Sequence, residues 1–199
     1  MPPGRAGATG PACTVPAMRV VAGTARGRPL VAPPGDRTRP TSDRVREAVF
    51  NALWSRGALD GATVVDLFAG SGALGVEALS RGAAHATFVD DDREARRAVQ
   101  RNLEACGLGD RATIASGRVE RWLAALPAGT RFDLAFCDPP YAFTGWGGLL
   151  AALPADLVVV ESDRSVDPPP GWEVVRDSRY GGTWVGFLTP ASRAGGDGD

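Results

Sequence analysis

From residue 63 onward, short apolar runs alternate with amphipathic stretches. The run 132–137 is apolar and β-prone, which is typical of a strand buried on both faces of a parallel sheet. The same pattern predicts strands at 63–68, 86–90, 112–116, 132–137 and 156–162, and helices at 42–55, 73–82, 92–107, 119–126 and 144–153. Because strands alternate with helices, we predict an α/β fold with a mainly parallel sheet and helices on both faces.

The two ends of the chain follow other patterns. Residues 18–33 suggest two short strands around a basic turn, and residues 172–189 suggest a closing antiparallel hairpin. We therefore divide the chain into a disordered start, an N-terminal hairpin with a helix, an α/β domain and a disordered tail, with predicted bounds of 1–17, 18–56, 57–190 and 191–199.

Cysteine, histidine and hydropathy exclude several classes of protein. The three cysteines are widely spaced, which argues against a disulfide framework and a metal cluster. The single histidine, His85, falls in a turn, so we expect no bound metal and no histidine catalysis. No apolar run reaches the length of a membrane span, and residues 1–17 contain no hydrophobic core of a signal peptide. These features favour a reduced, cytoplasmic protein without membrane contact.

Charge is distributed unevenly along the chain. The formal net charge is −1, yet residues 18–56 contain eight arginines and only three acids. Clustered cations favour a surface that binds a polyanion such as nucleic acid. A solvated arginine-rich face would give the same pattern, and charge alone leaves both interpretations open.

A glycine-rich stretch follows the first predicted strand. Gly70, Gly72 and Gly75 have the spacing of a dinucleotide fingerprint, which dehydrogenases share. Asp66 at the strand end would repel a pyrophosphate and attract an ammonium or sulfonium group. Asp90 ends the next strand, where an acid can accept hydrogen bonds from ribose hydroxyls. A ligand with a ribose and a cationic amino-acid part, and without phosphate, is S-adenosylmethionine.

The tetrad "DPPY" follows the predicted strand 132–137. Proline fixes φ and lacks an N–H, so Pro139 and Pro140 make a stiff exit from the sheet. Such an exit holds the Asp138 carboxylate and the Tyr141 ring at the carboxyl end of the sheet, where ligands of open α/β folds bind. A proline turn that merely ends the strand is the alternative.

These motifs resemble those of the Rossmann-like, class I methyltransferases. "DLFAGSGALG" is similar to their first motif and "FVDDD" to their acidic motif on the second strand. The resemblance implies that Asp90 binds the ribose of S-adenosylmethionine. It also implies that the methionine part is surrounded by Asp66, Phe68, Ala69, Gly70, Ser71 and Gly72.

"DPPY" resembles the tetrad of methyltransferases that act on exocyclic amines of bases. The lone pair of such an amine is delocalised into the ring, so the amine attacks a methyl group poorly. The resemblance implies that Asp138 and the carbonyl of Pro139 accept both N–H bonds, while Tyr141 stacks on the extruded base and Pro140 lies against it.

The N-terminal third narrows the family. "MRVVAGTARGRPL" and "RPTSDRVREAVFNAL" resemble the RsmD-type 16S rRNA guanine-N2 methyltransferases, and the likeness runs from Met18 to about Thr189. It implies 16S rRNA or an assembled small subunit as the substrate, and we expect the chain to be a monomer. It implies RNA phosphate contacts from Arg26 and Arg28, and an entrance to the active site lined by Arg39, Thr41, Asp43 and Arg46.

One stretch departs from the family pattern. Relatives usually carry a small acid or amide after the third strand to reach the adenine amine, whereas this chain has Ser116, Gly117 and Arg118. We therefore expect adenine to be held by the backbone alone. Two alternatives to the rRNA enzyme stay open: a DNA adenine or cytosine amino-methyltransferase, for which the chain has little room, and a non-catalytic RNA-binding relative.

Overall fold

A computed structural model describes residues 18–34 and 43–191. The predictions made for Arg39, Thr41, residues 1–17 and residues 192–199 lie outside the described residues. Within the described ranges no helix is both long and apolar enough to cross a membrane.

The predicted strands and helices of the α/β region are present, with ends shifted by up to two residues. The strands are β1 (Thr63–Leu67), β2 (His85–Asp90), β3 (Ala112–Ser116), β4 (Phe132–Cys137), β5 (Ala155–Ser162), β6 (Trp172–Tyr180) and β7 (Thr183–Pro190). The helices are α1 (Asp43–Ser55), α2 (Ala73–Ser80), α3 (Arg93–Cys106), α4 (Val119–Ala124) and α5 (Trp146–Ala152), with a 3-10 turn, η1 (Gly109–Arg111).

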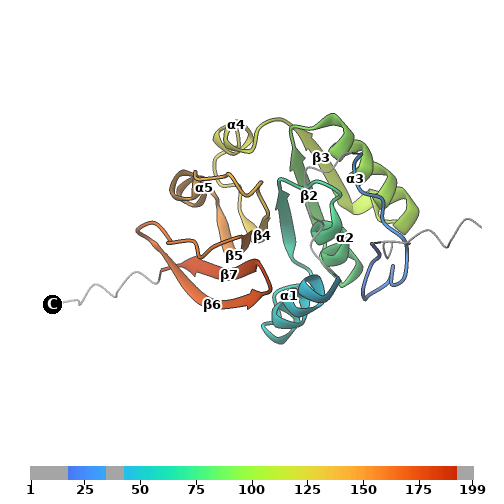
Figure 1. Ribbon diagram of the computed structural model, residues 1–199. Helices are drawn as coiled ribbons and strands as arrows, with labels where there is room; N and C mark the ends of the chain where they lie inside the picture. The colour runs from blue at the N-terminus through green and yellow to red at the C-terminus, as the bar shows by residue number, and fades with distance from the viewer. Residues whose placement is uncertain (1–17, 35–42, 192–199) are drawn as a thin grey trace, which may run out of the picture.

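These strands form one sheet in the order β3-β2-β1-β4-β5-β7-β6 (Figure 1). Strands β1 to β5 are parallel, and β7 and β6 close the sheet as an antiparallel hairpin. Because β1 and β4 are parallel neighbours, Leu67 lies opposite Cys137 and their carboxyl ends meet at one edge. The prediction of a mainly parallel α/β sheet is confirmed.

Helices cover both faces of the sheet. Helices α1, α2 and α3 share one apolar core with one face, where the rings of Phe50 and Phe136 lie 5.5 Å apart. Helices α4 and α5 lie side by side on the other face and pack Leu123 and Leu150 against it (Figure 1). Residues on both sides of the predicted domain boundary at residue 57 therefore belong to one core, since Phe50 and Leu53 of α1 are fully buried in it.

The two short strands expected over 18–33 are not formed. A single bridge joins Arg19 to Pro29. Other backbone groups of this segment, which we call the N-terminal hairpin (residues 18–31), bond to the domain. The N–H groups of Val21 and Ala22 donate to the Glu77 carboxylate of α2 at 2.7 and 2.9 Å. The segment does turn back on itself, since the Val20 N–H donates to the Arg28 carbonyl and the Leu30 N–H to the Met18 carbonyl. The pairing stays short because Pro29 lacks an N–H and Glu77 binds the next N–H groups of the first arm. The hairpin is therefore present, but its arms are too short to form strands.

Candidate active site

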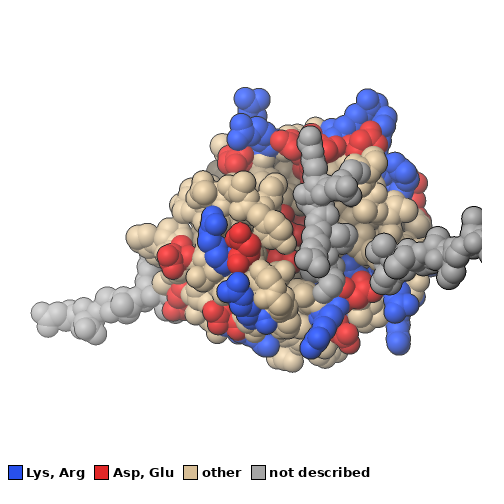
Figure 2. All heavy atoms as spheres, in the orientation of Figure 1, with Lys and Arg blue, Asp and Glu red and all other residues tan. Residues whose placement is uncertain are grey.

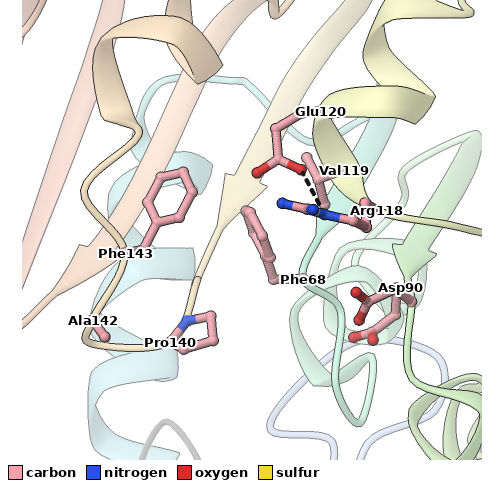
Figure 3. A pocket seen from close by; sticks show the side chains of 9 residues that line it. Phe68, Asp90, Arg118, Val119, Glu120, Pro140, Ala142 and Phe143 are labelled. Atoms are coloured by element: carbon pink, nitrogen blue, oxygen red, sulfur yellow. Dashed lines mark ion pairs between the residues drawn. The ribbon is translucent and has the colours of Figure 1, made fainter.

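The carboxyl edge of the sheet carries a cavity of about 310 Å³. It is bounded by residues that follow four different strands: Phe68 after β1, Asp90 and Asp91 at β2, Arg118, Val119 and Glu120 after β3, and Pro140, Ala142 and Phe143 after β4 (Figure 3). Segments far apart in the sequence thus meet at one site, at the place where open α/β sheets bind ligands.

Asp90 organises the glycine loop. One of its carboxylate oxygens accepts the Gly70 N–H at 2.8 Å, and the other accepts the Asp92 N–H at 2.8 Å. Burial raises the pKa of Asp90, while the two N–H donors act in the opposite direction. The carboxylate lies at the cavity wall, and each of its oxygens has a further lone pair for a ligand hydroxyl.

Side chains of α3 and β2 support the rest of the glycine loop. Asn102 of α3 is buried and donates to the Ser71 carbonyl at 2.8 Å. Gly75 allows α2 to pack against β2, because a Cβ at this position would lie 2.3 Å from the Phe88 ring. Ala69 and Gly72 are buried within the same turn. The loop is therefore shaped by its surroundings before any ligand binds.

Asp66 lies beneath the glycine loop and away from the cavity surface. It is 2% exposed and accepts the Gly75 N–H at 2.9 Å, inside the first turn of α2. Burial raises its pKa to about 7; the Gly75 bond opposes the rise and the nearby Asp90 adds to it. Asp66 is not among the residues that line the cavity. Its predicted contact with the methionine part stays a prediction.

Phe68 forms part of the cavity through an unusual backbone conformation. Its φ is +59°, in the left-handed region that non-glycine residues seldom adopt. Its ring meets the Phe143 ring edge-on at 5.4 Å, and Phe143 in turn meets Trp146 at 5.1 Å. This aromatic row joins the turn after β1 to the segment after β4, so the two halves of the site are packed together.

The tetrad leaves β4 at the same edge. Asp138 is half-buried, Pro139 is buried, and Pro140 lines the cavity. Tyr141 is 52% exposed, which leaves much of its side chain accessible beside the cavity. Because Leu67 and Cys137 are paired, Phe68 and Asp138 are the next residues on adjacent strands. The two motifs predicted from the sequence are thus brought together.

Arg118 and Glu120 are site residues that the sequence analysis missed. Both line the cavity, and the Arg118 Nε lies 3.7 Å from a Glu120 carboxylate oxygen (Figure 3). The family pattern directed attention to the positions that Ser116, Gly117 and Arg118 occupy. The sequence signal that could have identified Glu120 is its charge, two positions after Arg118 and in the first turn of α4.

Arg46 and Asp43 do not line the cavity. Arg46 is fully buried, and its guanidinium contacts Asp43 at 2.8 Å, the Arg19 carbonyl, and Glu77 at 3.9 Å. Burial lowers its pKa, and the two acids oppose this. In this structure Arg46 fastens α1 and the N-terminal hairpin to α2, which corrects the prediction that it lines the entrance.

The turn that carries Arg26 and Arg28 lies away from the cavity. Thr24 donates its N–H to the Ser80 carbonyl at 2.8 Å, and Ser80 ends α2 at the amino edge of the strands. Arg26 and Arg28 are exposed there, and RNA binding by them stays a prediction. On the face drawn in Figure 2, basic side chains stand among acidic ones, so the described residues form no continuous basic band there.

Within residues 18–34 and 43–191, no three His, Cys, Asp or Glu side chains are grouped as metal ligands would be.

Comparisons with known proteins found matches over most of this chain. A family model described as "Conserved hypothetical protein 95" matches residues 18–189. A Bacillus subtilis (strain 168) protein, provisionally named rRNA methyltransferase YlbH, is 41% identical over 160 residues, covering 76% of this chain and 86% of that protein. "Ribosomal RNA small subunit methyltransferase D" of Haemophilus influenzae is 31% identical over 174 residues, covering 82% of this chain and 89% of that protein.

A solved structure is similar over almost its whole length. It is an Escherichia coli protein, provisionally named methyltransferase yhhF, with 34% identity and a TM-score of 0.76. The match covers 87% of this chain and 98% of that one.

Proposed function

This chain belongs to the family described as conserved hypothetical protein 95, the RsmD-type methyltransferases that its motifs resemble, and from that premise we propose that it methylates the N2 amine of a guanine in 16S ribosomal RNA. One observation carries the proposal. The tetrad Asp138–Tyr141 leaves β4 directly beside the loop that leaves β1, and Pro140 and Phe68 line the same cavity. An amine clamp thus adjoins a cofactor loop.

The cavity fits S-adenosylmethionine in size and chemistry. Its volume of about 310 Å³ is within the range of small-molecule sites, roughly 300–1,000 Å³. Asp90 offers free lone pairs to ribose hydroxyls. Phe68 offers an apolar wall, and Glu120 an acceptor for an exocyclic amine such as that of adenine. We propose Glu120 for this last contact, in place of the acid or amide that relatives carry earlier in the loop.

The tetrad prepares the amine for attack. Asp138 and the Pro139 carbonyl accept hydrogen bonds from the two N–H groups of the amine and draw these hydrogens out of the base plane. The lone pair of the nitrogen is thereby localised. Tyr141 stacks on the base and holds it at the cavity mouth. When bound, S-adenosylmethionine supplies a methyl group on sulfonium, whose S–C bond breaks as the N–C bond forms. Asp138 then takes up the proton that leaves the nitrogen.

The proposal is tested with purified protein, methyl-labelled S-adenosylmethionine, and small subunits from cells that lack the enzyme. Nucleoside digestion should find the label on N2-methylguanine. Asp138→Ala should lower methyl transfer roughly 100-fold or more, the scale of losing one transition-state hydrogen-bond partner, while cofactor affinity is retained. Tyr141→Ala should be nearly as damaging and Tyr141→Phe mild, since stacking requires the ring alone. Label on N6-methyladenine, or a fully active Asp138→Ala variant, would refute the mechanism.

We assign this reaction to the cytoplasm and to a monomer, with naked 16S rRNA or an assembled subunit as the substrate. Sedimentation of the purified chain, and a comparison of the two RNA substrates at equal concentration, test these assignments.

A further inference from the structure

A second cavity, of about 330 Å³, lies between α1 and the turn that joins β6 to β7. Arg44 and Val45 line it from the first turn of α1, and Arg179, Tyr180 and Gly181 line it from the other side. The sequence analysis assigned no role to either arginine, and neither lies in the site described above. The labels in Figure 1 show the end of the β6–β7 hairpin beside α1.

Both guanidinium groups are available to a ligand. Arg44 and Arg179 are exposed, and in the part of the chain that the structure describes neither forms an ion pair. Arg179 only donates from Nε to the carbonyl of Gly181, at 3.4 Å, which holds its side chain along the turn.

Asp43 and Asp177, the acids nearest in the sequence to the two arginines, have other partners, and the exposed Glu47 is not among the residues that line this cavity. Asp43 contacts Arg46 at 2.8 Å and Arg19 at 3.8 Å. Asp177 accepts the indole N–H of Trp184 at 3.1 Å. The cavity therefore presents two cations and the positive end of a 13-residue helix, which together favour an anion.

This cavity is on the catalytic edge of the sheet. Arg179 lies opposite Trp184, and Trp184 lies opposite Ser162, the last residue of β5. In the neighbouring strand pair, Val160 lies opposite Cys137, the residue before the tetrad. Arg179 is thus level with the carboxyl end of β5, one strand beyond β7, and Arg44 lies across the cavity from it. Arg26 and Arg28, by contrast, are held at the amino edge through Ser80.

From this geometry we propose that Arg44 and Arg179 form a binding site for a backbone phosphate of the substrate RNA, close to the nucleotide that enters the catalytic cavity. The proposal rests on the proposed function. A phosphodiester meets the chemistry of the cavity because two guanidinium groups can donate to its unesterified oxygens. The contact would position the strand and would not select its sequence.

The test compares Arg44→Gln/Arg179→Gln with a control of equal charge change, Arg97→Gln/Arg101→Gln, on the exposed face of α3. RNA affinity is measured from low to high salt with small-subunit rRNA. The double variant should bind about tenfold more weakly, and its slope of log affinity against log salt should be shallower by about 1 to 2. The control and the cofactor affinity should change little. Arg44→Lys/Arg179→Lys should recover most of the slope, since the charges return.

Methylation kinetics separate this inference from the proposed function. The Gln variant should raise KM for RNA and leave kcat at saturating RNA nearly unchanged. A wild-type enzyme that methylates rRNA, with a Gln variant of unchanged affinity and salt slope, would overturn this site alone. A wild-type chain that neither binds nor methylates rRNA would overturn the proposed function, and this inference with it.

Discussion

Replacing Asp66 with asparagine should change how the stability of the fold depends on pH. Asp66 is buried, and its pKa is about 7 in the folded chain against an ordinary 3.8. Between these values the unfolded chain releases the proton that the folded chain retains, so the free energy of unfolding falls as pH rises. The stabilisation is complete below pH 3.8 and is lost by the time pH passes 7. At about 1.4 kcal/mol per pH unit, the loss between pH 5 and 8 is roughly 3 kcal/mol.

Asparagine removes this titration and keeps an oxygen for the Gly75 N–H. Urea unfolding at pH 5 and pH 8 should show the variant gaining roughly 3 kcal/mol relative to wild type as pH rises. Asp133→Asn is the control. Its pKa is lowered because the Thr63 N–H and hydroxyl donate to it, so its contribution is lost only in acid and is constant across this range. Wild type and Asp66→Asn with parallel pH dependences would refute the reasoning.

Three further changes test other parts of the structure. Asp90→Ala should weaken S-adenosylmethionine by roughly 10- to 100-fold in calorimetry, because hydrogen bonds to a charged group contribute about 1.5 to 3 kcal/mol; unchanged affinity would remove Asp90 from the site. Glu120→Ala should cost about tenfold in the same assay and Glu120→Gln less, since an acceptor remains; equal affinities would exclude the adenine contact. Gly23→Ala should destabilise the fold by more than Gly27→Ala, because both have φ above +80° but only the Cβ at residue 23 would meet the Ser80 carbonyl, at 1.9 Å; equal unfolding midpoints in urea would contradict this.

Local periodicity was sufficient to predict most strands and helices. The meeting of the glycine loop, Asp90 and the tetrad at one edge also followed from it, because motifs at the ends of parallel strands lie together. Phe68 and Pro140 were named as site residues only through the resemblance to methyltransferases. The N-terminal hairpin was predicted, but its two strands are absent, because Glu77, 55 and 56 residues away, binds the N–H groups of Ala22 and Val21. A hydrogen-bond partner so distant along the chain cannot be predicted from the local sequence.

Arg46 and Arg179 show two ways in which the role of a residue can escape sequence analysis. Arg46 follows Val45 and precedes Phe50 by one turn, so the helical period already placed it on the inner face of α1, although its charge suggested a surface role. Arg179 lies in a stretch without a motif, and only the tertiary structure brings it to Arg44. Chemistry formed by distant segments is what the sequence could not provide.

The attachment of the N-terminal hairpin has a consequence for recombination between relatives. Glu77 and Ser80 of α2 and Asn102 of α3 satisfy its backbone, and Asn102 also holds the Ser71 carbonyl of the glycine loop. A chimera that exchanges the hairpin without these three side chains would bury unpaired polar groups, at about 1 to 3 kcal/mol each. The segment is thus no interchangeable module. We expect the residues at positions 77, 80 and 102 to change together with the hairpin sequence. A graft of the hairpin alone should fail to dock and should also disturb the glycine loop.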